Sequence, residues 1–276
     1  MSLSAPHGAV IRWRVALAPL LPWLVPVLIL VAWQIAADGG WITRRTLPSP
    51  FAIAHAAVTL ALSGELLANV AISCQRAFLG FLIGGSLGLI SGILNGVSSL
   101  AARLLDTTLQ MLRNIPHLAI IPMVILWFGI GESAKLFLVA VGVFFPIYLN
   151  TYHGVRLVDA GLLEMGRIYQ LSRWAMFWRV ILPGAMPSIL LGVRYGLGIM
   201  WLTLIVAETI SANAGIGYMT MNAREFLQTD IVLVGVLLYA LLGKLADIAA
   251  RMLERWCLAW HPNFAANPNF AATKEG

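Results

Sequence analysis

The sequence is short of charge. Only 11% of its 276 residues are Asp, Glu, Lys or Arg, whereas soluble domains usually carry about 25%. Because 60% of the residues are hydrophobic, the composition excludes an ordinary soluble domain and predicts a membrane protein that crosses the bilayer several times. The net charge of +6 would suggest nucleic-acid binding in a soluble protein. In a membrane protein it indicates cationic cytoplasmic loops instead, and we expect no nucleic-acid partner.

The sequence also lacks the residue patterns of enzymes and metal sites. Its two cysteines, Cys74 and Cys257, fit neither a zinc-ligand spacing nor a disulfide framework. Its five histidines occur singly, without H-E-x-x-H or G-x-S-x-G, which argues against an intramembrane hydrolase. The nearest fragment to a phosphate-binding loop, Gly243-Lys244, lacks the leading glycine and the following hydroxyl. We therefore expect no cofactor and no ATPase site in this chain.

Apolar segments dominate what is there. A spanning helix needs roughly 20 mostly apolar residues. The first apolar segment, residues 15–37, is too long for a signal-peptide core and has no cleavage site after it, so we expect it to be retained. The predicted fold is an all-α polytopic membrane protein with about six transmembrane helices. The six candidates are residues 15–37, 77–102, 114–131, 136–155, 189–207 and 231–245.

Lys and Arg are distributed unevenly between the connecting segments. With the N-terminus in the cytoplasm, twelve of the 18 fall in cytoplasmic segments and five outside. Arg76 and Lys135 are counted with the outside segments, and Arg194 is the one cation placed inside a span. The positive-inside rule therefore predicts that both termini are cytoplasmic.

This topology divides the chain into four parts. Residues 1–14 form a cytoplasmic N-terminus. Residues 15–68 contain the first helix and an external segment, and within that segment we expect an interfacial helix at residues 51–67. Residues 69–256 form the transmembrane core, and the polar tail at 257–276 is expected to be disordered and cytoplasmic.

Glycine recurs at every fourth position of the second candidate helix. Such a row forms a flat groove that the backbone of another helix can approach closely. Packing within the bundle is the interpretation we favour, and a sliding contact that serves gating is the alternative. The row consists of Gly80, Gly84, Gly88, Gly92 and Gly96.

Polar and aromatic residues in or near the spans are candidates for a transport pathway. An anionic substrate requires cations, N–H donors or helix N-termini near the bilayer midplane. Glu208 is an odd neighbour for an anion, so a structural hydrogen bond is preferred for it, and Arg194 is expected to snorkel to the cytoplasmic interface. Packing or interface roles stay open for the whole set. The candidates are Asn114, His117, Trp127, Trp201, Thr203, Glu208 and Asn213.

A basic insert at residues 157–187 interrupts the apolar pattern. Its core, EMGRIYQLSRWAMFWRVILPGAMP, predicts a short helix over 162–169 and a second over 173–181 with Ser172 as its N-cap. Two short helices joined by a turn would make a helix–turn–helix elbow on the cytoplasmic side.

The second helix of this elbow is amphipathic. Its aromatic residues share one face, while Arg173 and Arg179 lie on the other. Pro183 and Pro187 are expected to end the helix and turn the chain back to the membrane. The pattern fits either an interfacial helix on lipid headgroups or a docking element for a cytoplasmic partner.

The insert resembles the EAA loop of bacterial ABC importer permeases. That pattern is Glu-Ala-Ala, three residues, Gly, nine residues, Ile, one residue, Leu-Pro. Glu164, Leu182 and Pro183 match it in register. Gln170 occupies the glycine position, and the substitution matters because glycine would permit a turn with positive φ. The coupling-loop residues implied by the resemblance are Glu164, Met165, Gly166, Gln170, Arg173, Leu182 and Pro183.

The resemblance covers roughly residues 20–260. The stretches 105–154 and 200–230 are very similar to aliphatic sulfonate permeases of the nitrate/sulfonate/taurine branch. The resemblance implies that the chain is a type I ABC importer transmembrane domain in the bacterial inner membrane. Two copies would form the pore, each docking one cytoplasmic ATPase subunit, and a periplasmic binding protein would deliver the substrate.

The substrate implied is an aliphatic sulfonate, with taurine, nitrate or another small anion as alternatives. An ion-coupled secondary transporter is the alternative from a different class. That class usually brings membrane-embedded acids and inverted repeats, and beyond Glu208 the chain offers little of either.

Overall fold

The computed structural model describes residues 21–43, 45–116 and 118–260. In these ranges every regular element is a helix, which confirms the predicted all-α fold. The helices are α2 (Leu21–Asp38), α3 (Pro50–Leu62), α4 (Glu65–Val97), α5 (Ser99–Arg113), α6 (Ile121–Phe128), α7 (Glu132–Arg156), α8 (Ala160–Ile168), α9 (Arg173–Met176), the π-helix η1 (Phe177–Ile181), α10 (Leu182–Ser211), α11 (Ile216–Glu225) and α12 (Thr229–Cys257).

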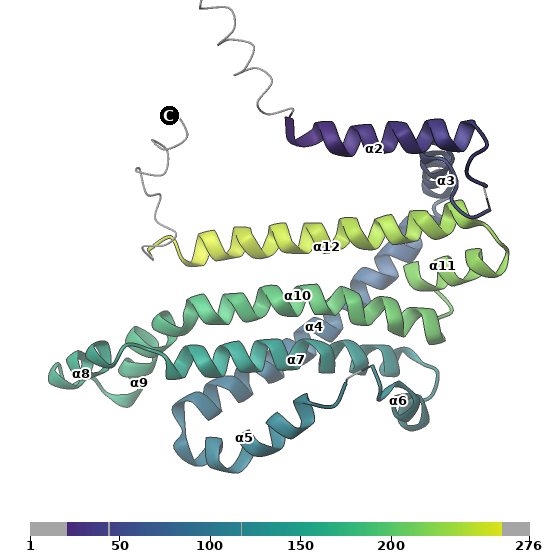
Figure 1. The fold of residues 1–276 in the computed structure, drawn as a ribbon. Helices are drawn as coiled ribbons and strands as arrows, with labels where there is room; N and C mark the ends of the chain where they lie inside the picture. Colours follow the sequence, from purple (N-terminus) through teal and green to yellow (C-terminus); the bar gives the residue numbers. More distant parts are fainter. Residues whose placement is uncertain (1–20, 44, 117, 261–276) are drawn as a thin grey trace, which may run out of the picture.

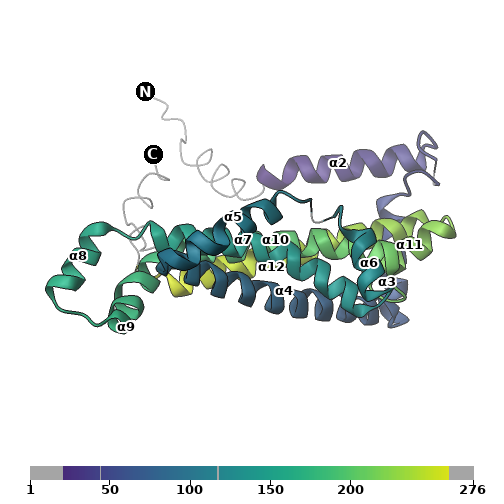
Figure 2. The same ribbon diagram turned by 90° about the horizontal axis from the view of Figure 1, so that it is seen from below.

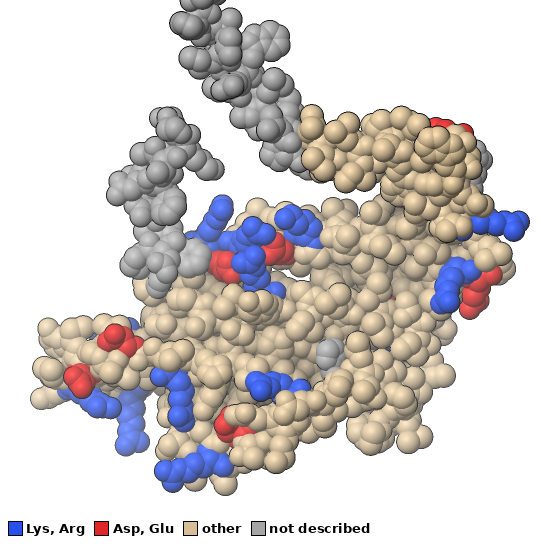
Figure 3. All heavy atoms as spheres, in the orientation of Figure 1, with Lys and Arg blue, Asp and Glu red and all other residues tan. Residues whose placement is uncertain are grey.

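The long helices run side by side, so the molecule is elongated. The elbow formed by α8 and α9 lies at one end, and α3, α6 and α11 lie at the other (Figures 1 and 2). Figure 3 shows charged side chains towards the elbow half and at the opposite edge, with a broad uncharged belt between them. Such a belt suits the hydrocarbon core of a bilayer.

Four helical segments in the described part of the chain are long and apolar enough to cross a membrane. They are α4, α7, the continuous run from α9 through α10, and α12. The predicted spans 136–155, 189–207 and 231–245 lie inside α7, α10 and α12 and are confirmed as helices. Part of the first candidate, 15–20, lies outside the described residues, and α2 covers the remainder.

The third predicted span, 114–131, is wrong. In its described part the regular helix is α6, whose eight residues are too few to cross a bilayer. Pro116 and Pro122 each lack a backbone N–H, which limits regular helix here. Helices α5 and α6, which are joined through the described residues 114–116 and 118–120, together lead from the elbow end towards the opposite end (Figures 1 and 2).

The second predicted span, 77–102, has the wrong ends. Helix α4 begins twelve residues earlier, at Glu65, and stops at Val97. Ser98 then leaves the helical conformation, and its hydroxyl accepts a hydrogen bond from the backbone N–H of Ala101 at 3.2 Å, so that it caps α5.

The predicted interfacial helix 51–67 is too long. Helix α3 starts after the N-cap Ser49 and ends at Leu62, and Gly64 with φ 81° separates it from α4. It buries Ile53, Ala56 and Leu60, and it packs on α12 and α4.

Helix α7 packs along the glycine row of α4. A Cβ atom at Gly80 would lie 2.6 Å from Val139 Cγ1, and one at Gly88 would lie 2.6 Å from the carbonyl oxygen of Phe144. At Gly84 it would overlap the backbone of Ala140. Gly92 and Gly96 meet the same helix in the same way. Any side chain on this row would push the two spanning helices apart.

Candidate functional site

The elbow is a compact hairpin of two short helical arms. Asp159 caps α8 by accepting the backbone N–H groups of Gly161 and Leu162 at 2.7 and 3.2 Å. The arms touch where α8 has no side chain, because a Cβ atom at Gly166 would lie 2.7 Å from Met176 Cε of α9. The predicted helix over 162–169 is therefore confirmed, with its start two residues earlier.

The turn between the arms places Gln170 in the left-handed region. Its φ is 52°, the kind of conformation that a glycine at this position of the EAA pattern would adopt most easily. The backbone N–H of Leu171 donates to the carbonyl oxygen of Gly166 at 3.0 Å and closes the turn. Gln170 thus keeps a left-handed turn at a cost of roughly 1–2 kcal/mol relative to an ordinary backbone conformation.

The second arm begins as the sequence predicts. The Ser172 hydroxyl accepts the backbone N–H of Ala175 at 3.2 Å, which confirms it as the N-cap. Trp174, Phe177 and Trp178 form an aromatic cluster, with ring centroids 5.3 to 6.5 Å apart.

The prolines do not end this helix, contrary to the prediction. The chain passes from α9 through the π-helix η1 into α10 without a break. Pro183 occupies the first turn of α10, and Pro187 lies inside it. Pro183 has no N–H to donate, and directly before it the N–H of Leu182 reaches back five residues to the carbonyl of Phe177. The wider π-helical spacing at this point replaces the ordinary helical hydrogen-bond pattern that a proline would interrupt. The second arm of the elbow is therefore continuous with a spanning helix.

The outer surface of the elbow is apolar and basic. Ile168, Tyr169 and Trp174 are 79%, 75% and 71% exposed. Three arginines are exposed as well, Arg167, Arg173 and Arg179, together with the acid Glu164 of α8. A cavity of about 280 Å³ opens between α8 and the start of α10. Its lining includes Met165, Gly166, Tyr169, Arg179, Pro183 and Trp260. Large exposed apolar side chains around a cavity are typical of a surface that another protein covers.

The candidate pathway residues do not meet in one place. Asn114 is exposed after α5, Asn213 is exposed before α11, and Trp127 lies on α6. Trp201 and Thr203 are buried on α10, where the Trp201 ring packs edge-on against Tyr239. His117 lies outside the described residues.

Glu208 has the structural hydrogen bonds that the sequence argument preferred for it. Its carboxylate accepts from the Ser73 hydroxyl at 2.8 Å, from Arg76 Nη1 at 2.8 Å, and from the Tyr239 hydroxyl and the Gly217 N–H at 2.9 Å each. The residue is only 1% exposed. Four donors satisfy a carboxylate that would otherwise be costly to bury.

Sequence reasoning missed two other members of this buried network. Arg76 and Lys135, assigned above to outside segments, lie within α4 and α7 and are 5% and 3% exposed. Arg76 donates to both carboxylate oxygens of Glu132 at 2.6 Å, and Lys135 Nζ lies 3.0 Å from the same carboxylate. The signal was present, since Asn69, Ser73, Arg76 and Gly80 recur at three- and four-residue intervals on one face of α4.

Arg194 is accordingly not the one cation within a span. The sequence pattern predicts that this side chain extends to the cytoplasmic interface. In the structure it forms an ion pair within the protein, with its Nε 2.9 Å from Asp247 Oδ1 of α12.

The same network anchors the start of α11. The N–H groups of Gly215, Ile216 and Gly217 donate to Asn69, Ser73 and Glu208 at 2.8 to 2.9 Å. Because the first N–H groups of a helix have no helical acceptor, these side chains of α4 and α10 satisfy them and fix the loop at 212–217.

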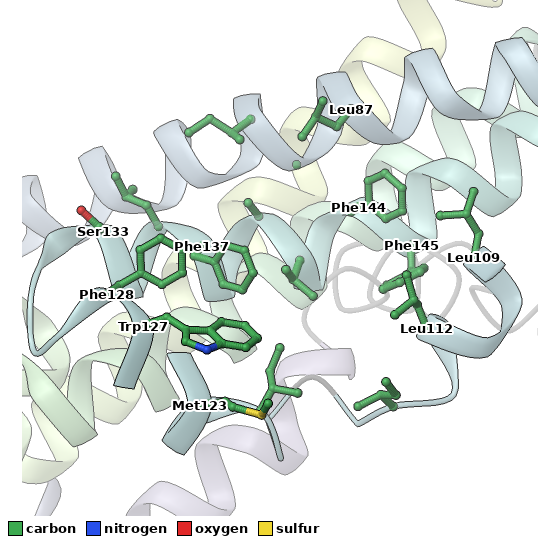
Figure 4. Close-up of a pocket in the computed structure, with 17 residues that line it drawn as sticks. Leu87, Leu109, Leu112, Met123, Trp127, Phe128, Ser133, Phe137, Phe144 and Phe145 are labelled. Atoms are coloured by element: carbon green, nitrogen blue, oxygen red, sulfur yellow. The ribbon is translucent and has the colours of Figure 1, made fainter. Parts of the chain in front are cut away.

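A second feature is an open apolar cavity of about 770 Å³ beside α4 and α7 (Figure 4). Helices α5 and α6 and the link between them complete its wall. Of the candidate pathway residues, Trp127 lines it.

Comparisons with known proteins agree with these features. The profile of the family described as "Binding-protein-dependent transport system inner membrane component" matches residues 84–258. The chain is 61% identical to a protein named as an aliphatic sulfonates transport permease, SsuC of Escherichia coli (strain K12), over 92% of this chain and 95% of that protein.

A second relative and a solved structure are more distant. The taurine transport system permease protein TauC of the same organism is 33% identical, over 92% of this chain and 95% of its own. An inward-facing structure of the MetNI methionine ABC transporter shares the fold, with 19% identity, a TM-score of 0.50, and coverage of 69% of this chain and 95% of that one. The chain belongs to the family of inner-membrane components of binding-protein-dependent transport systems.

Proposed function

We propose that this chain is the pore-forming permease subunit of an ATP-driven importer of aliphatic sulfonates. The substrate assignment rests on one observation: the chain is 61% identical to a relative named for aliphatic sulfonates, and 33% identical to one named for taurine. Two copies would line the pore in the bacterial inner membrane, and a periplasmic binding protein would deliver the anion.

The elbow supplies the site for the ATPase partner in this proposal. Its exposed apolar and basic side chains surround a cavity and form a surface to which a cytoplasmic subunit can bind. With the elbow on the cytoplasmic side, the end of α12 nearest the C-terminus also lies on that side (Figure 1). We assign one ATPase subunit to each elbow, and hydrolysis to that subunit.

Coupling follows from the continuity of the helix. Movement of the elbow is transmitted along η1 into α10, and α10 carries Glu208, which is bonded to α4, α11 and α12. ATPase closure then biases the pore because the ATPase makes different contacts with the elbow in the two states of the transporter. The chain's own part is mechanical: it receives the displacement and passes it to the helices around the pathway.

Reconstitution tests the proposal. Proteoliposomes with this chain, its ATPase subunits and its binding protein are expected to take up a short alkanesulfonate only when ATP is enclosed with the ATPase. Taurine and nitrate serve as competitors. Preferred uptake of either would contradict the sulfonate assignment, and uptake by the chain alone on an ion gradient would support a secondary transporter.

A further inference from the structure

The large cavity is apolar almost throughout. Of its 17 lining residues, only Ser133 and Trp127 bring a side-chain hydroxyl or N–H group. In Figure 4 the rings of Trp127, Phe137 and Phe144 and the side chain of Leu112 surround a common space. Phe128 and Phe137 pack at a centroid distance of 5.0 Å along one side. A volume of about 770 Å³ falls in the range of small-molecule sites.

This lining cannot hold a sulfonate group. None of the 17 residues is charged, and an anion without cations or several N–H donors is unfavourable in such surroundings. The same surface is favourable for an alkyl chain, since each methylene moved from water into an apolar site strengthens binding by roughly fourfold.

The helix break argues that the cavity opens to water or protein rather than to lipid. Ile115 and Ile120, which line it, belong to the non-helical link between α5 and α6. Irregular backbone at membrane depth is tolerated where it is buried in protein or lines a water-filled cavity. Broken membrane helices of this kind border substrate sites in other transporters.

A cation stands next to the cavity in the chain. Arg113 follows the lining residue Leu112 at the end of α5, is exposed, and makes no ion pair with another described residue. Cavity and cation together match a molecule with an anionic head and an aliphatic tail.

We propose that this cavity binds the alkyl tail of the sulfonate during translocation, with the sulfonate group outside it on the side of Arg113. The inference rests on the proposed import of aliphatic sulfonates and identifies the part of the permease that distinguishes substrates by tail length. Trp127 and Leu87 are then specificity-determining residues.

Chain-length profiles test the proposal. Leu87→Trp fills part of the cavity from α4, and Leu94→Trp makes the same change on the same helix outside it, at nearly equal exposure of 55% and 53%. Each variant is placed in proteoliposomes with the complete complex and the same binding protein. ATP-driven uptake of methanesulfonate, butanesulfonate and octanesulfonate is then compared with that of the unmodified chain.

Leu87→Trp is expected to lower octanesulfonate uptake at least tenfold relative to methanesulfonate uptake, while Leu94→Trp leaves that ratio unchanged. Trp127→Ala, which shortens a 60% exposed side chain and should not disturb folding, is expected to raise KM several-fold for octanesulfonate and little for methanesulfonate.

An unchanged ratio of octanesulfonate to methanesulfonate uptake in both cavity variants would overturn the assignment, because it would show that the tail does not enter. The absolute uptake then distinguishes the other occupants. Equal loss at every chain length in Leu87→Trp would assign the face to a second copy of the chain, and unaltered uptake throughout would assign it to lipid. If the unmodified complex imports no alkanesulfonate, the proposed function itself fails, which is a separate outcome.

Discussion

Arg76 of α4 and Glu208 of α10 form a buried ion pair across 132 residues of sequence, with Arg76 Nη1 2.8 Å from Glu208 Oε1. Their side chains are 6% and 0% exposed. Arg76 also holds Glu132 of α7, and Glu208 also holds Tyr239 of α12. One pair thus joins four long helices at the half of the bundle far from the elbow.

Replacing Glu208 by alanine should destabilise the protein strongly. Ser73, Tyr239 and the Gly217 N–H would lose their acceptor, and Arg76 would lose one of its two carboxylates, so a cost of about 3–5 kcal/mol is expected. Denaturant unfolding of the detergent-solubilised chain measures it. Glu225→Ala, an exposed acid at the end of α11, is the control and should change little. Similar unfolding of the two variants would refute the role assigned to the network.

Substituting the glycine row should separate α4 from α7. Gly84→Ala places a methyl group on the backbone of Ala140, which cannot move aside as a side chain can, and a loss of about 1–3 kcal/mol is expected. Gly243→Ala on α12 is the matched control, because its Cβ would meet no atom within 4 Å. There the higher helix propensity of alanine should leave stability equal or raise it by up to about 1 kcal/mol. The thermal unfolding midpoint of Gly84→Ala should therefore lie below that of Gly243→Ala, and the reverse order would contradict the packing role of the glycine row.

A feature can be predicted from the sequence when the contacts that determine it are local. The start of the elbow's second arm was predictable because the Ser172 hydroxyl accepts a hydrogen bond from Ala175, only three residues later. The glycine row was predictable because its four-residue period lies within one helix. Hydropathy alone misplaced Arg76 and Lys135. The two acids that pair with Arg76 come from other helices, α7 and α10. Glu132 lies only three residues before Lys135 on α7, but the burial of that pair depends on how the helices pack, which hydropathy does not report.

Proline was misread for a related reason. Pro116 and Pro122 accompany the broken span, as a missing N–H suggests, yet Pro183 and Pro187 lie within a continuous helix. Whether a proline ends a helix depends on what the neighbouring turns do, and the preceding π-helix changes the hydrogen-bond partners there. That adjustment has no signal in composition or periodicity.

Gln170→Gly should stabilise the elbow. Glycine adopts the observed φ of 52° without the steric cost that a side chain brings, so a gain of roughly 1 kcal/mol is expected, reduced by the greater freedom of glycine in the unfolded chain. Tyr169→Gly is the neighbouring control, because Tyr169 has φ −75° and should gain nothing. Limited proteolysis of the elbow, which reports local opening, is the measurement. Faster cleavage of the Gln170→Gly chain would contradict the expectation.

Glu164→Lys and Pro183→Ala should uncouple ATP hydrolysis from uptake while the helices still insert. Glu164 is exposed on α8, and Pro183 lines the elbow cavity at the start of α10, so neither change removes a buried contact of the spanning helices. In the complete complex, the rate of uptake per ATP hydrolysed is expected to fall at least tenfold. Glu225→Lys, the same reversal of charge at the opposite end of the molecule, should leave that ratio unchanged.

A scrambled segment 164–183 extends the same test. If the elbow only rests on lipid headgroups, a scrambled sequence of equal composition keeps its charge and apolar content and should still support transport. If it is the docking element, the ATPase should no longer co-purify, because specific side chains around the 280 Å³ cavity make the contact. Full transport by the scrambled chain would therefore rule out the coupling role, whatever the point variants do.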